Sequence, residues 1–150
     1  MDFVELQDVI NFAIDKEQEA MDFYGDLAGK VKHKAIAEEF QKMVEIEQNH
    51  RDRLKAMDVG EAAKTAVAPA QNLKIADYLV DLEPSPNMSW QDVVHVAMKR
   101  ELAAMNLYTD LAKMVADPNA KQLFENLAAD ESAHKLYFEK IWDDEIMKDW

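Results

Sequence analysis

Cysteine is absent from this 150-residue chain, and glycine and proline are scarce, with 3 and 4 copies respectively. The lack of cysteine excludes disulfides, thiolate zinc sites and iron–sulfur clusters. The scarcity of glycine and proline removes most of the turn residues on which hairpins of short strands depend. We therefore predict an all-α protein, and the length suits a single domain covering residues 1–150.

Long apolar runs and basic clusters are missing as well. No stretch approaches the ~18 uninterrupted apolar residues of a membrane span, and residues 1–5 have neither the basic nor the apolar region of a secretory signal. The formal net charge of -13 disfavours nucleic acids and anionic membranes, because affinity for phosphates needs clustered Lys and Arg. We expect a soluble, cytoplasmic protein with no nucleic-acid or membrane partner.

The chain contains an internal repeat with an offset of 84 residues. When positions 7–54 are aligned with 91–138, 15 of the 48 pairs are identical and no gap is needed. Two similar helical halves predict a bundle with an internal pseudo-two-fold axis. The matched pairs include Glu17 with Glu101, Tyr24 with Tyr108, Glu47 with Glu131, and His50 with His134.

Each half is expected to form two long amphipathic helices. In the first half these cover residues 3–28 and 34–57, and Gly29 and Gly60 follow them as stop signals. The connection between the two helices is short, which predicts antiparallel neighbours.

The second half has recognisable helix starts. Ser89 and Asp92 form a capping-box pattern. Asp117 followed by Pro118 is a cap residue with proline at the first helical position, and we expect that helix to run to about residue 144.

A longer segment, residues 58–88, joins the two halves, and we expect a short helix at 73–82 within it. An antiparallel four-helix bundle with one long central crossover connection is the ferritin-like topology. We therefore predict a ferritin-like fold built from a two-fold repeat of a helix pair.

One inward-facing stripe on each expected helix is marked by alternating steps of three and four residues. The stripes are apolar except near their middles, where no Lys or Arg occurs but four Glu and two His interrupt them. A buried carboxylate is costly unless it is paired, and two divalent cations would balance four carboxylates while imidazoles completed the ligand set. We predict a two-metal site at Glu17, Glu47, His50, Glu101, Glu131 and His134.

The spacing of these residues supports the same prediction. Glu47-x-x-His50 and Glu131-x-x-His134 place two ligands one turn apart on a helix face. Glu17 and Glu101 each precede the matching Glu by 30 residues, so a helical hairpin brings them to similar depth. This is the constellation of di-iron carboxylate bundles. Two iron ions are therefore the expected cofactor, with manganese or zinc as substitutes.

Other polar residues admit less specific interpretations. Tyr24 and Tyr108 lie two turns beyond their Glu on the stripes. They either hydrogen-bond the ligand carboxylates from outside or are core aromatics with satisfied hydroxyls, and the sequence leaves both alternatives open. His33 and His95 have no partners at ligand spacing, and we interpret them as surface or rim residues.

Four motifs occur in order along the chain: Glu17-x-x-Ala20-x-x-Phe23-Tyr24, Glu47-x-x-His50, Glu101-x-x-Ala104-x-x-Leu107-Tyr108 and Glu131-x-x-His134. With them the sequence resembles the rubrerythrin branch of the ferritin-like superfamily. The resemblance implies a di-iron centre that reduces hydrogen peroxide with electrons from a rubredoxin-like iron centre. Because these residues include no cysteine, the electron donor would be a separate molecule.

Two departures from related families bear on the chemistry. Rubrerythrins have an additional Glu ligand on the third helix at the place of Ala104, and its loss leans towards oxygen-dependent oxidation of ferrous iron. In bacterioferritin a haem-ligating Met stands where this chain has Gln48, and we expect no fifth helix within these 150 residues. A haem-bearing storage cage is therefore disfavoured.

Three functional hypotheses follow. The first is an oxidoreductase of the peroxidase or ferroxidase type, acting in oxidative stress on peroxide or dioxygen and forming a homodimer. In it the six ligands are also the catalytic residues, with Glu47 and Glu131 bridging the metals and Glu17 and Glu101 as terminal ligands. The alternative is iron binding or storage without significant turnover. The third is a structural bundle whose site is vestigial or holds zinc or manganese.

Overall fold

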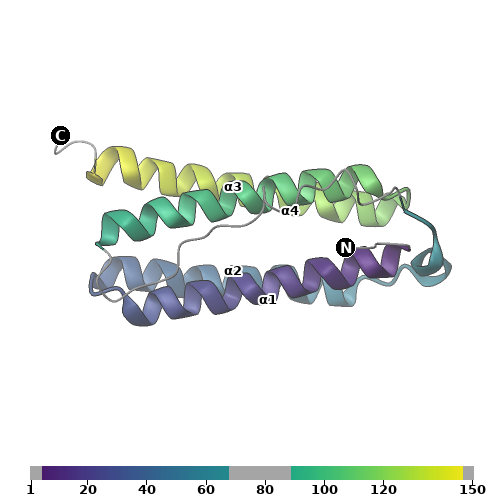
Figure 1. Cartoon of the computed structure of the whole chain (residues 1–150), viewed down its shortest axis with the longest axis horizontal. Coiled ribbons are helices and arrows are strands. Elements are labelled where there is room, and N and C mark those ends of the chain that lie inside the picture. Colours follow the sequence, from purple (N-terminus) through teal and green to yellow (C-terminus); the bar gives the residue numbers. More distant parts are fainter. Residues whose placement is uncertain (1–4, 68–88, 147–150) are drawn as a thin grey trace.

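The computed structural model describes residues 5–67 and 89–146. Four long helices lie side by side and form a bundle (Figure 1). They are α1 (Leu6–Lys30), α2 (Lys34–Ala56), α3 (Trp90–Met114) and α4 (Pro118–Ile141). A short 3-10 helix, η1 (Gly60–Lys64), follows α2, and a π-helical turn, η4 (Trp142–Ile146), follows α4. The predicted ferritin-like four-helix bundle is confirmed.

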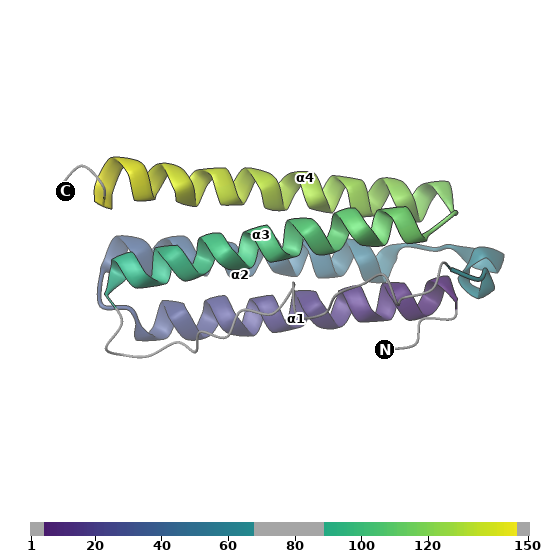
Figure 2. The same ribbon diagram turned by 45° about the horizontal axis from the view of Figure 1, so that its top comes forward.

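The helices pair within each half of the repeat. α1 packs along α2 and α3 packs along α4, and each pair is antiparallel (Figures 1 and 2). α2 and α3 run in the same direction, which is the arrangement of a bundle with a long connection between its second and third helices. The short helix expected at 73–82 lies outside the described residues.

Capping side chains explain where the second-half helices begin. The Ser89 hydroxyl accepts the Asp92 backbone N–H at 3.2 Å, and the Asp92 carboxylate accepts the Ser89 N–H at 3.3 Å. The Asp117 carboxylate accepts the Ala120 N–H at 2.9 Å, with Pro118 at the first helical position. Both predicted helix starts are confirmed.

The start of α1 and the C-terminal ends of two helices differ from the prediction. α1 begins at Leu6 and not at residue 3, because the Asp8 carboxylate caps that end by accepting the Glu5 backbone N–H at 3.0 Å. α1 continues through Gly29 to Lys30, because the Val31 N–H still donates to the Leu27 carbonyl at 2.9 Å and Gly29 stays helical. α4 ends at Ile141, not near residue 144, because the chain widens there into the π-helical turn η4. None of these differences moves a proposed ligand off the inward stripes.

The buried apolar core consists of two clusters, one towards each end of the bundle. One includes Val9, Leu111 and Phe124, and the other includes Phe40 and Phe138. Between the two clusters each of the four helices contributes one buried glutamate, and α2 adds the buried His50. None of the described helices is both long and apolar enough to cross a membrane.

Candidate metal centre

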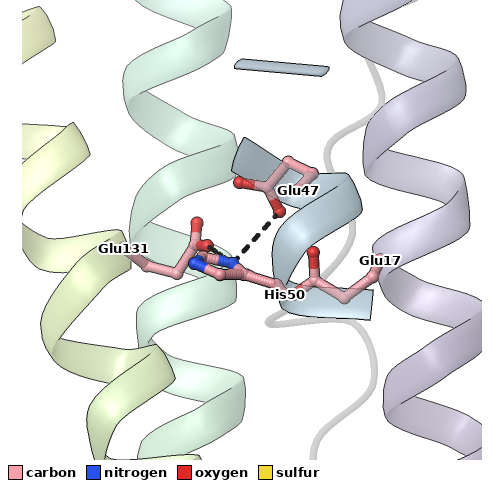
Figure 3. Close-up of side chains that lie close together, drawn as sticks. All are labelled: Glu17, Glu47, His50 and Glu131. Carbon is pink, nitrogen blue, oxygen red and sulfur yellow. Dashed lines mark ion pairs between the residues drawn. The ribbon is translucent and has the colours of Figure 1, made fainter. Parts of the chain in front are cut away.

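The six residues predicted as ligands come together in the layer between the two apolar clusters. They form two overlapping groups, in each of which one ligand atom per residue lies within 4.8 Å of the others. The first group is Glu17, Glu47, His50 and Glu131, whose side chains converge between the helices (Figure 3). The second is Glu47, Glu101, Glu131 and His134. Glu47 and Glu131 belong to both groups.

Burial is nearly complete across the cluster. The four Glu and His50 are all at most 2% exposed, whereas the His134 side chain is 19% exposed. Each helix contributes its residues from the inward stripe, so the amphipathic pattern that forms the core also turns these polar groups inward. Carboxylates at this depth require compensation from hydrogen bonds, protons or cations.

The imidazoles face the carboxylates through the same nitrogen. His50 Nδ1 lies 3.0 Å from Glu131 Oε1, 3.6 Å from Glu17 Oε1 and 3.8 Å from Glu47 Oε2. His134 Nδ1 lies 3.6 Å from Glu101 Oε2. The two rings stack with their centroids 6.1 Å apart. Each half of the repeat therefore supplies one imidazole nitrogen to one end of a carboxylate cluster.

Unsatisfied atoms provide a test of whether a metal pair fits here. Each of the six residues has one buried side-chain atom without a hydrogen-bond partner: Glu17 Oε2, Glu47 Oε1, His50 Nδ1, Glu101 Oε2, Glu131 Oε1 and His134 Nδ1. Buried polar atoms are rarely left unpaired, so such a set requires an explanation. Oxygen and imidazole donors of this kind suit divalent iron, manganese or zinc. The residues fit a two-metal centre.

Without cations, the cluster must relieve its charge by binding protons. Burial, followed by the neighbouring Glu17, raises the pKa of Glu47 well above its usual range. Burial and the charges of Glu101 and Glu47 do the same for the pKa of Glu131. Burial lowers the pKa of His50, but its contacts with Glu17 and Glu47 outweigh that effect and raise it to about 10. The layer between the two apolar clusters therefore lacks the positive charge needed to balance its four carboxylates.

Two tyrosines donate hydrogen bonds to Glu17 and Glu101, the carboxylates that each belong to only one of the two groups. The Tyr24 hydroxyl donates to Glu101 Oε1 at 2.6 Å, and the Tyr108 hydroxyl donates to Glu17 Oε1. Each tyrosine therefore donates its hydrogen bond to the glutamate of the other half of the repeat. Burial and the nearby carboxylates raise the pKa of both phenols, which keeps them as hydrogen-bond donors. Of the two alternatives left open by the sequence, the structure shows the hydrogen bond to the carboxylates.

One contact was missed by sequence reasoning. His50 Nε2 lies 3.2 Å from Asp130 Oδ2, the geometry of an imidazole N–H donating to a carboxylate. Arg53 Nη1 donates to the same Asp130 oxygen at 3.3 Å. Such a carboxylate fixes the tautomer of an imidazole and leaves its other nitrogen free to bind a metal. The available signal was a break in the repeat, because Ile46 occupies the position matching Asp130.

The remaining histidines lie away from the cluster, as predicted. His33 caps the N-terminus of α2, where its Nδ1 accepts the Ile36 N–H at 3.4 Å. His95 is exposed, and its ring centroid lies 5.6 Å from that of Trp142.

Comparison with known proteins places this arrangement in a family. A hypothetical protein from Pyrococcus furiosus is 24% identical with a TM-score of 0.64, and the alignment covers 93% of this chain and 89% of that one. The crystal structure of a putative ferritin-like diiron-carboxylate protein from Thermotoga maritima is 18% identical with a TM-score of 0.74, covering 96% of this chain and 98% of that one. No curated protein gives a significant match. The rubrerythrin family model matches residues 8–142, and the chain therefore belongs to the rubrerythrin family.

Proposed function

We propose that this protein is a di-iron oxidoreductase that reduces hydrogen peroxide or dioxygen. The observation that carries the proposal is the set of six buried ligand atoms, contributed by four Glu and two His, that make no hydrogen bond. A purely structural bundle would gain nothing from such a set, because each unpaired buried polar group destabilises the fold. Membership of the rubrerythrin family supports peroxide as the oxidant.

The overlap of the two residue groups suggests how the ligands divide. Glu17 and His50 would hold one metal ion, and Glu101 and His134 would hold the other. Glu47 and Glu131 belong to both groups, so they would bridge the pair. When bound, the two ferrous ions supply two electrons to the oxidant.

The protein groups around the centre prepare it for this role. The apolar clusters on both sides shield the layer between them from water at the two ends of the bundle, which strengthens the electrostatic interactions there. Tyr24 and Tyr108 orient Glu101 and Glu17 by donating hydrogen bonds to one oxygen of each. The other oxygen of each carboxylate is left to bind metal.

Electrons to restore the ferrous state would enter from outside the bundle. These 150 residues contain no cysteine, so they hold no thiolate iron centre that could act as the donor. We therefore include a separate electron donor in the proposal.

Anaerobic loading with Fe(II), followed by stoichiometric peroxide or air, tests the proposal. We expect two iron ions per chain, oxidation of both by one equivalent of peroxide, and repeated turnover once a reductant is supplied. The matched control is the Glu47→Gln/Glu131→Gln variant, which removes both shared carboxylate charges. Protein that binds two irons but consumes neither peroxide nor dioxygen would contradict the proposed activity.

A further inference from the structure

A pocket between α1 and α3 leads from the surface to one side of the candidate centre. Its volume is about 120 Å³, and Glu17 and Glu47 form part of its lining. A single water needs only about 10–15 Å³ of such space, so the pocket holds several water-sized molecules. It is too small for a drug-sized ligand, whose sites usually occupy several hundred Å³.

The wall of this pocket is made of small side chains. Ala20 on α1 and Ala103 and Ala104 on α3 line it. Ala20 and Ala104 occupy the same position in the two halves of the repeat. Because neither has atoms beyond Cβ, the two helices leave open space beside the carboxylates at this level.

Two cations line the same pocket, and they are also related by the repeat. Lys16 and Arg100 occupy matching positions in the two halves. Lys16 Nζ forms an ion pair at 3.1 Å with Glu19, which also lines the pocket and offsets the lysine charge. The Arg100 guanidinium stacks over Phe23 with its central carbon 4.1 Å from the ring centroid. In the described part of the chain Arg100 has no ion-pair partner, so its charge is available to a ligand in the pocket.

We propose that this pocket is the passage by which a small oxygen species reaches the centre, and that small anions bind in it. The inference rests on the proposed function. The four glutamates of the cluster would balance two divalent ions, and the ferric state would carry two further positive charges beside the pocket. Arg100 adds another at the wall. Size and charge together favour a ligand of two or three heavy atoms, neutral or singly negative.

Azide is the probe, because it is a triatomic anion whose binding to ferric iron is seen by absorbance. Ala104→Val and Ala104→Leu fill the pocket progressively without altering any of the six proposed ligands. Ala128→Leu is the control, since Ala128 lines a different hollow of about 250 Å³, together with Thr109 and Lys121, that includes none of the six. Azide is titrated into each protein loaded with two ferric ions, with metal content and helicity measured alongside.

We expect the Ala104 variants to keep two irons per chain and to bind azide more weakly and more slowly. For Ala104→Leu the dissociation constant should rise at least about tenfold, a change of about 1.4 kcal/mol. Ala104→Val should show an intermediate effect, and Ala128→Leu should behave as the wild type. Unchanged azide affinity and rate in Ala104→Val at full metal content would overturn the passage, even if Ala104→Leu failed to fold.

Failure of the passage and failure of the proposed function give different results. A wild-type protein that binds two irons and azide but reduces neither peroxide nor dioxygen contradicts the function alone. Ala104 variants that match the wild type in azide binding, while the wild type turns over, contradict the passage alone.

Discussion

The two halves of the candidate centre have the same ligand types but hold their imidazoles differently. The His50 side chain is 2% exposed. Its outer nitrogen, Nε2, faces the carboxylate of Asp130, which also accepts a hydrogen bond from Arg53. The His134 side chain is 19% exposed. In the described part of the chain no carboxylate lies within ion-pair distance of its outer nitrogen, and the position matching Asp130 is Ile46.

This difference distinguishes the residues that are identical in the two halves of the repeat from those that differ. The six proposed ligands and the two tyrosines that contact them are identical at matching positions of the two halves. The halves differ in the contact to the outer imidazole nitrogen, because Asp130 faces His50 Nε2 and no carboxylate of the described residues faces His134 Nε2. An imidazole fixed by a carboxylate is a stronger and better oriented metal ligand than an unsupported one. We therefore expect the ion at the His50 side to be bound more tightly than the ion at the His134 side.

The largest expected effect comes from the residues that belong to both halves. Glu47→Gln combined with Glu131→Gln should reduce iron content from two ions per chain to none, because both ions lose their shared carboxylates. Metal analysis after anaerobic loading and desalting measures this. Glu45→Gln, which changes an exposed residue of α2, is the control and should keep both ions. If the double variant retains one ion, the two groups do not share their ligands as proposed.

Single histidine substitutions come next and separate the halves. His50→Ala and His134→Ala should each retain one ion per chain, since each removes the imidazole of one group only. The ion retained by His134→Ala should dissociate about tenfold more slowly than the one retained by His50→Ala, because Asp130 still supports His50. Chelator competition followed over time measures both rates. Equal rates would show that the Asp130 contact does not affect metal binding.

A smaller effect is expected from changing the residues at the matching positions 130 and 46. Asp130→Asn should weaken the tighter ion about tenfold, as is usual when a carboxylate that orients a metal-binding imidazole is lost. Ile46→Asp places a carboxylate at the matching position and should strengthen the weaker ion, at some cost in stability from burying charge at a partly buried site. Competition titrations of each variant measure the two affinities. A lack of response to Asp130→Asn would contradict the inequality of the two sides.

Removal of either tyrosine hydroxyl should lower the stability of the protein to the same extent in the two halves. Tyr24→Phe and Tyr108→Phe each remove one hydrogen bond to a buried carboxylate. Each should lower the free energy of unfolding of the metal-free protein by about 1–3 kcal/mol, and by similar amounts. Urea denaturation measures both. Clearly unequal losses would mean that the asymmetry extends inside the cluster.

The fold and the inward residues were predictable because they obey periodic rules. Glu17 and Glu101 interrupt apolar stripes at positions that a helix turns inward, and the repeat places them at equal depth. Ser89 and Asp117 mark helix starts by a local hydrogen bond that depends on a few neighbouring residues. Such signals need no knowledge of the tertiary structure.

The supporting contacts were not predictable from the same rules, because they depend on how the helices are placed around one another. The stripe pattern does not decide whether Tyr24 serves Glu17 or Glu101, and only the packed bundle shows that it crosses to the other half. Asp130 lies off the inward stripe with 46% of its side chain exposed, like many solvated charges. The pocket beside Ala104 depends on the separation of α1 and α3, which no local pattern encodes.

The most direct test of the account is the number of iron ions that the chain binds and the residues on which that number depends. An anaerobic Fe(II) titration of the wild type should saturate at two ions per chain, with His134→Ala saturating at one and Glu47→Gln/Glu131→Gln binding none. A wild type that binds no iron, or a stoichiometry unchanged by these substitutions, would contradict the claim that this buried Glu and His cluster is a metal centre.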